Sequence, residues 1–195
     1  MIVLRVTKRN IKIAIAAAVK VLKRGGVIAY PTETTYGLGC DPRNAKAVRR
    51  IYAIKGREKK KPLLLVASST AQVKKVAKLV GANLEFAKRF WPGPLTLVLP
   101  ARNGKKEIAA RVSSSKFVQS LTEAYGFPII STSANKSGKK ECRSGRAIAS
   151  TFQNQKNRPD FVIDVGSLPK RKVSTVARVG EDGRVEVLRH GAVRI

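Results

Sequence analysis

Apolar residues at helical spacing open the chain and lead into a short stretch with no charged residue. Between Ile11 and Leu22 the apolar positions recur every three or four residues, and two glycines follow at 25–26. This pattern predicts a helix that ends at the glycines. Residues 27–30 are apolar or aromatic without interruption, which predicts a buried strand.

The rest of the chain alternates between helical and strand patterns. Asp41 followed by Pro42 predicts a helix N-terminus, and the apolar spacing after it predicts that this helix ends near Lys55. Further helices are predicted from Ser69 or Thr70 to 78, from Asn83 to 90, over 116–125, and from Ser144 to about 152. Strands are predicted over 63–67, 95–99, 109–112, 128–131, 161–164, 175–179 and 185–188, with a hairpin turn at 181–183 between the last two.

This order of elements predicts the fold class. Helices and strands alternate for most of the chain, and strands gather at its end, which indicates an α/β (α+β) protein with a mixed sheet and helices packed on its faces. The chain has 195 residues, no internal repeat and no low-complexity segment, so we expect one domain that spans residues 1–195.

Charge is the unusual feature of the composition. Forty Lys and Arg residues against 12 Asp and Glu give a formal net charge of +28. Such a surface attracts polyanions, with an affinity that falls steeply with salt. Basic runs occur along the whole chain, which favours a broad basic face over a detachable arm: 59–61, 74–75, 105–106, 139–140 and 170–172. A general basic bias of the proteome is the alternative.

Several kinds of site and location are disfavoured by the composition. Cys40 and Cys142 give neither a disulfide framework nor a metal pattern, and the single His190 argues against multi-histidine zinc sites and against a Ser-His or Cys-His pair. The uncharged apolar run at 13–19 is too short to span a bilayer, and Arg5 interrupts the N-terminal apolar residues of any signal peptide. We therefore expect a cytoplasmic protein without membrane association.

A hydroxyl-rich loop follows the strand predicted at 27–30. Thr32, Thr34 and Thr35 surround Glu33, and residues 36–39 add two glycines. Hydroxyls packed so densely at the end of a buried strand indicate a site rather than a connector. The role of Glu33 stays open, as a brace for a basic residue or as an aid to a metal.

Two further segments carry candidate chemistry. Lys55 and Arg57 flank Gly56 at a predicted helix end, where a point charge and a bidentate fork suit phosphate, but a solvated cationic helix C-terminus explains them equally well. Residues 131–138 present small hydroxyls and an amide after an apolar strand, either as a site or as an ordinary strand-to-loop junction. The chain contains neither a P-loop nor a complete Gly-x-Gly-x-x-Gly pattern, so side chains and loop amides must build any phosphate site.

Taken in order, these segments resemble the YrdC/TsaC family of threonylcarbamoyl-AMP synthases over nearly the whole chain. No single motif is decisive, but seven in the family's order are specific. They lie at 31–39, 55–57 with 61–63, 92–96, 111–112, 131–138, 174–176 and 188–191. The chain departs from the usual pattern at Glu58, Ser113, Val173 and 141–143.

The resemblance implies a fold and a reaction. The family fold is a twisted mixed sheet flanked by helices, with a basic concave face. The family joins L-threonine, bicarbonate and ATP, with Mg²⁺, into threonylcarbamoyl-adenylate and pyrophosphate, as a nucleotidyltransferase. Partner proteins then move the threonylcarbamoyl group to the adenosine beside the anticodon of certain tRNAs. The chain resembles the short, single-domain form.

The resemblance also implies site residues. Lys55 and Arg57 would be catalytic and would clamp the phosphates of ATP. Further contacts to ATP are implied for Ser133, Asn135 and Arg189. L-Threonine would be held by Thr32, Thr34, Arg111, Ser131 and Ser174, with Arg111 pairing its carboxylate.

Two other functions remain open. The charge of +28 suits an RNA-binding module in tRNA or rRNA maturation, but the chain has no aromatic-basic RNA motif, so we expect weak, salt-sensitive binding of RNA, double-stranded RNA included, as a secondary property. A related carbamoyl-transfer domain that uses another acceptor is the other alternative.

Overall fold

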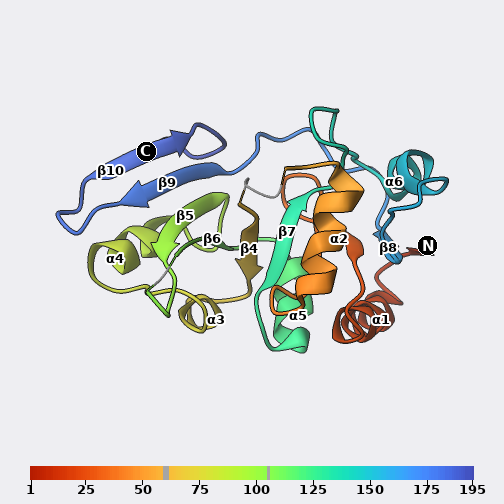
Figure 1. The fold of residues 1–195 in the computed structure, drawn as a ribbon, viewed down its shortest axis with the longest axis horizontal. Helices are drawn as coiled ribbons and strands as arrows, with labels where there is room; N and C mark the ends of the chain where they lie inside the picture. The colour runs from red at the N-terminus through yellow and green to blue at the C-terminus, as the bar shows by residue number, and fades with distance from the viewer. Residues whose placement is uncertain (59–61, 105) are drawn as a thin grey trace. The chain divides into compact units, whose positions relative to one another are not determined.

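A computed structural model describes residues 1–58, 62–104 and 106–195, so the basic run at 59–61 and Lys105 lie outside the described residues. The elements in chain order are β1 (Ile2–Arg5), α1 (Ile11–Lys23), β2 (Ile28–Pro31), β3 (Tyr36–Gly39), α2 (Ala45–Lys55), β4 (Leu64–Ala67), α3 (Thr70–Lys74), α4 (Gly81–Phe90), β5 (Leu95–Pro100), β6 (Glu107–Val112), α5 (Lys116–Tyr125), β7 (Ile129–Ser133), α6 (Gly145–Phe152), β8 (Phe161–Asp164), β9 (Thr175–Val179) and β10 (Val185–Arg189) (Figure 1).

The chain forms two compact units. Unit 1 consists of Met1–Leu63 and Ile129–Lys170, and unit 2 of Leu64–Pro128 and Arg171–Ile195. Each unit combines mixed β-structure with packed helices, which confirms the predicted α/β fold class with a mixed sheet.

Unit 1 contains the strand order β1-β8-β2-β3-β7. β8 pairs in parallel with β1 and β2, whereas β3 pairs antiparallel with β2 and β7. Helix α1 packs on β8 and β2, and α6 packs on β8. Every residue of β2 and β3 is buried, because both are inner strands of this order. The loop that joins them, residues 32–35, is therefore attached at both ends to fully buried strands.

Unit 2 contains the strand order β4-β6-β5-β9-β10. β4 with β6 and β5 with β9 are parallel pairs, whereas β5 with β6 and β9 with β10 are antiparallel. α4 packs on β5 and β9, and α5 packs on β4. Alternate residues of β5, namely Leu95, Leu97 and Leu99, belong to the hydrophobic core of this unit. Figure 1 shows β9 and β10 as a long hairpin that leads to the C-terminus.

Most predicted elements are present, and several have the predicted ends. α5 has its predicted bounds, and Ser144 caps α6 by accepting a hydrogen bond from the backbone N–H of Ala147. The hairpin predicted at 181–183 joins β9 to β10. These elements are the ones whose limits are fixed by local chemistry, a capping hydroxyl or a turn glycine.

Some predicted helix ends are wrong. Asp41 does not cap α2: it accepts from the N–H of Arg43 in a local turn, and Asn44 caps the helix instead. α4 begins at Gly81, so Asn83 lies inside the helix. α3 ends at Lys74 rather than at 78, because Lys78 N–H donates to the carbonyl of Pro100 outside the helix.

Two strands were not predicted. β1 is a short strand that pairs with β8 alone in the strand order of unit 1. β3 contains two glycines, which weaken any strand pattern. It forms because β2 and β7 pair with it on either side.

Across the described ranges, no helix is both long enough and apolar enough to cross a bilayer.

Candidate active site

The loop between β2 and β3 is organised by the hydroxyl of Thr32. Its Oγ1 donates to the carbonyl of Thr35 at 2.6 Å and accepts from the N–H groups of Thr34 and Thr35 at 3.2 and 3.3 Å. The hydroxyls of Thr32 and Thr34 lie 3.2 Å apart. Thr32 Oγ1 therefore contacts both Thr34 and Thr35 and fixes the conformation of the loop.

The threonine loop is tied to the segment that follows β7. Ala134 N–H donates to the carbonyl of Tyr36 at 2.8 Å, and Thr35 Oγ1 donates to the carbonyl of Cys142 at 3.0 Å. Cys142 N–H in turn donates to the carbonyl of Ala134 at 3.0 Å. The hydroxyl-rich loop and residues 134–142 are thus ordered together within unit 1.

Gly37 makes room for two of the predicted site residues. A Cβ at this position would lie 3.2 Å from Ser131 Oγ and 3.4 Å from Thr32 Cγ2. Ser131 is buried in β7, next to the threonine loop. Unit 1 therefore brings together three of the residues predicted to hold an amino acid, Thr32, Thr34 and Ser131.

Lys55 ends α2 and is only 3% exposed. Its Nζ donates to the carbonyl of Ser133 at 2.6 Å, to the carbonyl of Asn135 at 3.1 Å and to Asn135 Oδ1 at 2.9 Å. The pKa of Lys55 is lowered to about 8, mainly by burial and secondly by repulsion from Arg57. Attraction to Glu141 acts in the opposite direction and raises the pKa. An ammonium has three protons, so each of them has an acceptor inside unit 1.

Asn135 completes this cluster. Its Oδ1 accepts from Ser133 Oγ at 2.7 Å as well as from Lys55, and its Nδ2 donates to the carbonyl of Lys139 at 2.6 Å. Ser137 N–H donates to the carbonyl of Lys55 at 2.8 Å. Lys55, Ser133 and Asn135, all predicted to contact ATP, are therefore one connected group.

Arg57 follows a glycine in the left-handed conformation that closes α2. Gly56 has φ 59°, and Arg57 N–H donates back to the carbonyl of Tyr52 at 3.0 Å. One guanidinium nitrogen of Arg57 donates to the carbonyl of Pro62 at 3.2 Å, while its Nε has no hydrogen-bond partner among the residues that the structure describes. The half-buried fork of Arg57 thus keeps donor capacity for a ligand.

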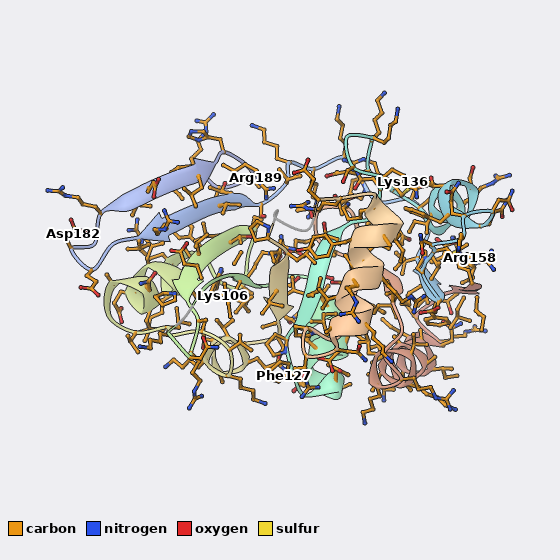
Figure 2. The ribbon with its side chains drawn as sticks, in the orientation of Figure 1. Lys106, Phe127, Lys136, Arg158, Asp182 and Arg189 are labelled. Atoms are coloured by element: carbon orange, nitrogen blue, oxygen red, sulfur yellow. The ribbon has the colours of Figure 1, made fainter. Side chains whose placement is uncertain are left out.

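Unit 2 holds the remaining predicted residues. Ser174 is 4% exposed, and Arg189, the last residue of β10 (Figure 2), donates to its carbonyl at 2.8 Å and to its Oγ at 3.0 Å. Arg111 is 4% exposed in β6, where it pairs in register with Val66 of β4. Arg111 supplies a buried positive charge, and Ser174 supplies a hydroxyl that is hydrogen-bonded to Arg189. Such groups recognise carboxylates and phosphates.

Two residues near Ser174 were not predicted as part of the site. Thr96 Oγ1 donates to Ser174 Oγ at 3.0 Å. The same segment is held by Trp91, whose Nε1 donates to the carbonyl of Leu95 at 2.7 Å. A Cβ on Gly191 would lie 2.5 Å or less from the backbone of 173–175, so only glycine fits there. The signal for both was their place within motifs at 92–96 and 188–191.

The predicted residues thus fall into two sets. Unit 1 brings together the threonine loop with Ser131, and Lys55 with Ser133 and Asn135. Unit 2 brings Arg189 to Ser174 and buries Arg111. Within the described ranges no three or more His, Cys, Asp or Glu residues are grouped so as to hold a metal ion.

The family follows from comparison with known proteins. A family model for Sua5, YciO and YrdC proteins, described as telomere recombination, matches residues 20–191, and the chain belongs to this family. A threonylcarbamoyl-AMP synthase from Vibrio vulnificus is 38% identical over 185 residues, which cover 89% of this chain and 96% of that protein. Another, from Halorhodospira halophila, is 41% identical over 140 residues, 67% of this chain and 73% of that protein.

Solved structures agree with this assignment. The crystal structure of P. abyssi Sua5 complexed with L-threonine has a TM-score of 0.80 and 34% identity over 97% of this chain, which spans 56% of that protein. E. coli YciO has a TM-score of 0.80 and 27% identity, covering 97% of this chain and 93% of its own. The predicted family fold of a mixed sheet flanked by helices is therefore confirmed.

Proposed function

We propose that this chain is a threonylcarbamoyl-AMP synthase that forms L-threonylcarbamoyl-adenylate and pyrophosphate from L-threonine, bicarbonate and ATP. The observation that carries the proposal is the 38% identity to the V. vulnificus synthase along 96% of that protein. The chain would act as a nucleotidyltransferase, because it would move an adenylyl group from ATP to a carbamate oxygen.

The reaction needs no covalent bond to the protein. The amine of L-threonine and bicarbonate form a carbamate and release water. A carbamate oxygen then attacks the α-phosphorus of ATP, and pyrophosphate leaves with the electrons of the broken P–O bond. Positioning and charge neutralisation at the phosphates are sufficient sources of rate enhancement for such a step.

We assign the phosphates of ATP to the cluster in unit 1. Arg57 would supply a bidentate fork, and the Lys55 ammonium a point charge. Since every Lys55 proton has an acceptor in Ser133 or Asn135, a direct bond from Lys55 to phosphate requires one of these bonds to open. Lys55 would therefore both shape the turn at 133–135 and respond to the ligand. Arg189, in unit 2, is a further proposed contact to ATP.

Mg²⁺ would enter with ATP. This ion commonly binds one or two carboxylates together with substrate phosphates and waters rather than an all-protein cage. When bound, Mg²⁺ neutralises phosphate charge.

We assign L-threonine to the hydroxyl-rich residues and Arg111. In unit 1, Thr34 and Ser131 would bind its polar groups, while Thr32 shapes the loop. In unit 2, the Arg111 guanidinium would pair with its carboxylate and Ser174 would add a hydrogen bond. The adenylate would pass to partner proteins that transfer the threonylcarbamoyl group to tRNA, in the cytoplasm, where these substrates meet.

The proposal is tested by incubating the purified protein with L-threonine, radiolabelled bicarbonate, Mg²⁺ and ATP, and measuring pyrophosphate and labelled adenylate. Lys55→Ala and Arg57→Ala should each lower kcat/KM by at least about 100-fold, because each removes a charged donor at the phosphates. Lys46→Ala, on the exposed face of the same helix, is the matched control and should retain activity. Folded wild-type protein that yields neither product would refute the proposal.

RNA binding is proposed as a secondary property. The net charge of +28 supports it, and Figure 2 shows long side chains that end in nitrogen on many elements. We expect contacts to the phosphates of RNA rather than to its bases. Contacts to phosphate do not select a sequence.

A further inference from the structure

Ser174 is held in a hydrogen-bond arrangement that fixes the direction of its own proton. Its Oγ accepts from Thr96 Oγ1 at 3.0 Å and from a guanidinium N–H of Arg189 at 3.0 Å. A serine hydroxyl has two lone pairs and one proton. Both lone pairs are therefore used, and the proton alone is left to interact.

The described part of the chain provides no acceptor for this proton. Among the residues that the structure describes, Ser174 Oγ donates to none. Both hydroxyls belong to buried residues, because Ser174 is only 4% exposed and Thr96 is 1% exposed. A buried donor without an acceptor is unfavourable, so the arrangement suits a ligand that brings one.

The chemistry of that acceptor follows from the charge beside it. The Arg189 guanidinium donates to both the carbonyl and the hydroxyl of Ser174, so a positive charge lies within 3.0 Å of the hydroxyl oxygen. An anionic oxygen gains most from a donor next to a cation. The carboxylate of an amino acid and a phosphate of a nucleotide share this chemistry.

We propose that Thr96 is a positioning residue that orients the Ser174 hydroxyl as a hydrogen-bond donor toward an anionic oxygen of the substrate. The backbone supports this role. β5 and β9 pair in parallel with Thr96 opposite Val176, and Thr175 N–H donates to the carbonyl of Pro94 at 3.0 Å, so the two hydroxyls are held at a fixed separation.

The inference rests on the proposed function for the identity of the ligands. Its central test is a double-mutant cycle with Thr96→Val and Ser174→Ala, because valine keeps the shape of threonine and removes only the hydroxyl. KM and kcat are measured separately for L-threonine and for ATP. Calorimetric binding of each ligand, without turnover, keeps the test independent of the synthase reaction.

Ser174→Ala should weaken one ligand about 10- to 100-fold, as expected for loss of a hydrogen bond to a charged group. Thr96→Val should weaken the same ligand about 3- to 10-fold, since the donor remains but is no longer oriented. Thr96→Ser should restore the affinity. In the Ser174→Ala background, Thr96→Val should have no further effect on that ligand.

A matched control separates orientation from packing. Thr122→Val, also in unit 2, removes a buried hydroxyl that donates only to carbonyls of its own helix α5, so it should leave both affinities unchanged. A selective loss of L-threonine would identify a carboxylate as the acceptor, and a selective loss of ATP a phosphate. The proposal would be overturned if Thr96→Val weakened ligand binding equally in the wild-type and Ser174→Ala backgrounds. It would also be overturned if Thr96→Val left the affinity unchanged.

Discussion

Lys55 uses its whole hydrogen-bonding capacity inside unit 1. Its three protons go to Ser133 and Asn135, and the pKa of its ammonium is lowered to about 8, first by burial. In the unfolded chain the same group titrates near its ordinary value, about 10.4. Between these two values the unfolded chain binds one proton more than the folded chain, so the free energy of unfolding rises with pH in that window.

This linkage predicts the pH dependence of a single variant. Lys55→Met keeps an unbranched apolar stem of similar size but cannot titrate. Relative to Lys55→Met, the free energy of unfolding of the wild type should rise by about 2 kcal/mol as pH increases from about 8 to about 10. Urea denaturation of both proteins at several pH values measures the difference. A difference that stays constant with pH would show that Lys55 keeps its ordinary pKa.

At the residue scale, the sequence predicted which residue types gather but not how they are bonded. Lys55 and Asn135 were singled out from their chemistry and motif, and the structure joins them through one oxygen, Asn135 Oδ1. No sequence pattern predicts the hydrogen bond from Thr96 to Ser174, because this bond depends on β5 and β9 lying side by side.

At the scale of elements, the C-terminus of α2 determines where Lys55 and Arg57 point. Gly56 adopts φ 59°, and a Cβ there would meet no atom within 4 Å. Gly126 ends α5 in the same way, with φ 78° and equally open space. A substitution at either glycine therefore introduces backbone strain without a steric clash.

These two glycines form a matched pair for a test. Gly56→Ala and Gly126→Ala should each lower the free energy of unfolding by about 1–2 kcal/mol, the strain of a left-handed alanine. Only Gly56→Ala should also raise KM for ATP, because Gly56 lies between the two cations. Urea denaturation and steady-state kinetics measure both effects. An equal rise of KM in both variants would assign the effect to general destabilisation.

The same scale shows where prediction from sequence ends. Ser69, Ser144 and Asn44 all cap helices through side-chain oxygens, yet only the two serines were predicted as caps. Asp41 looked equivalent to Asn44, but it closes a local turn instead. β3, with its two glycines, is a strand because its neighbours pair with it. Local sequence signals thus predict that an element exists. Its exact ends, and strands such as β3, depend on contacts with the rest of the fold.

At the scale of the whole molecule, charge acts in two different ways. A few cations, such as Lys55 and Arg111, are buried and bound in defined positions. Most of the 40 Lys and Arg residues contribute instead to a general positive potential. The sequence gives the total directly, and the fold decides which cations belong to a site. The two contributions should respond differently to salt, since buried groups are screened much less.

Salt therefore separates RNA binding from substrate binding. If RNA is held by the general positive charge, neutralising four phosphates would weaken its binding by about 100-fold between 50 and 200 mM salt. L-Threonine is a zwitterion, and we propose that buried groups bind it, so its KM should change little over the same range. Fluorescence anisotropy with a labelled tRNA and steady-state kinetics, both in the same buffers, provide the comparison. RNA affinity that persists at high salt would indicate base contacts and a specific RNA site, because counterion release accounts only for the salt-dependent part.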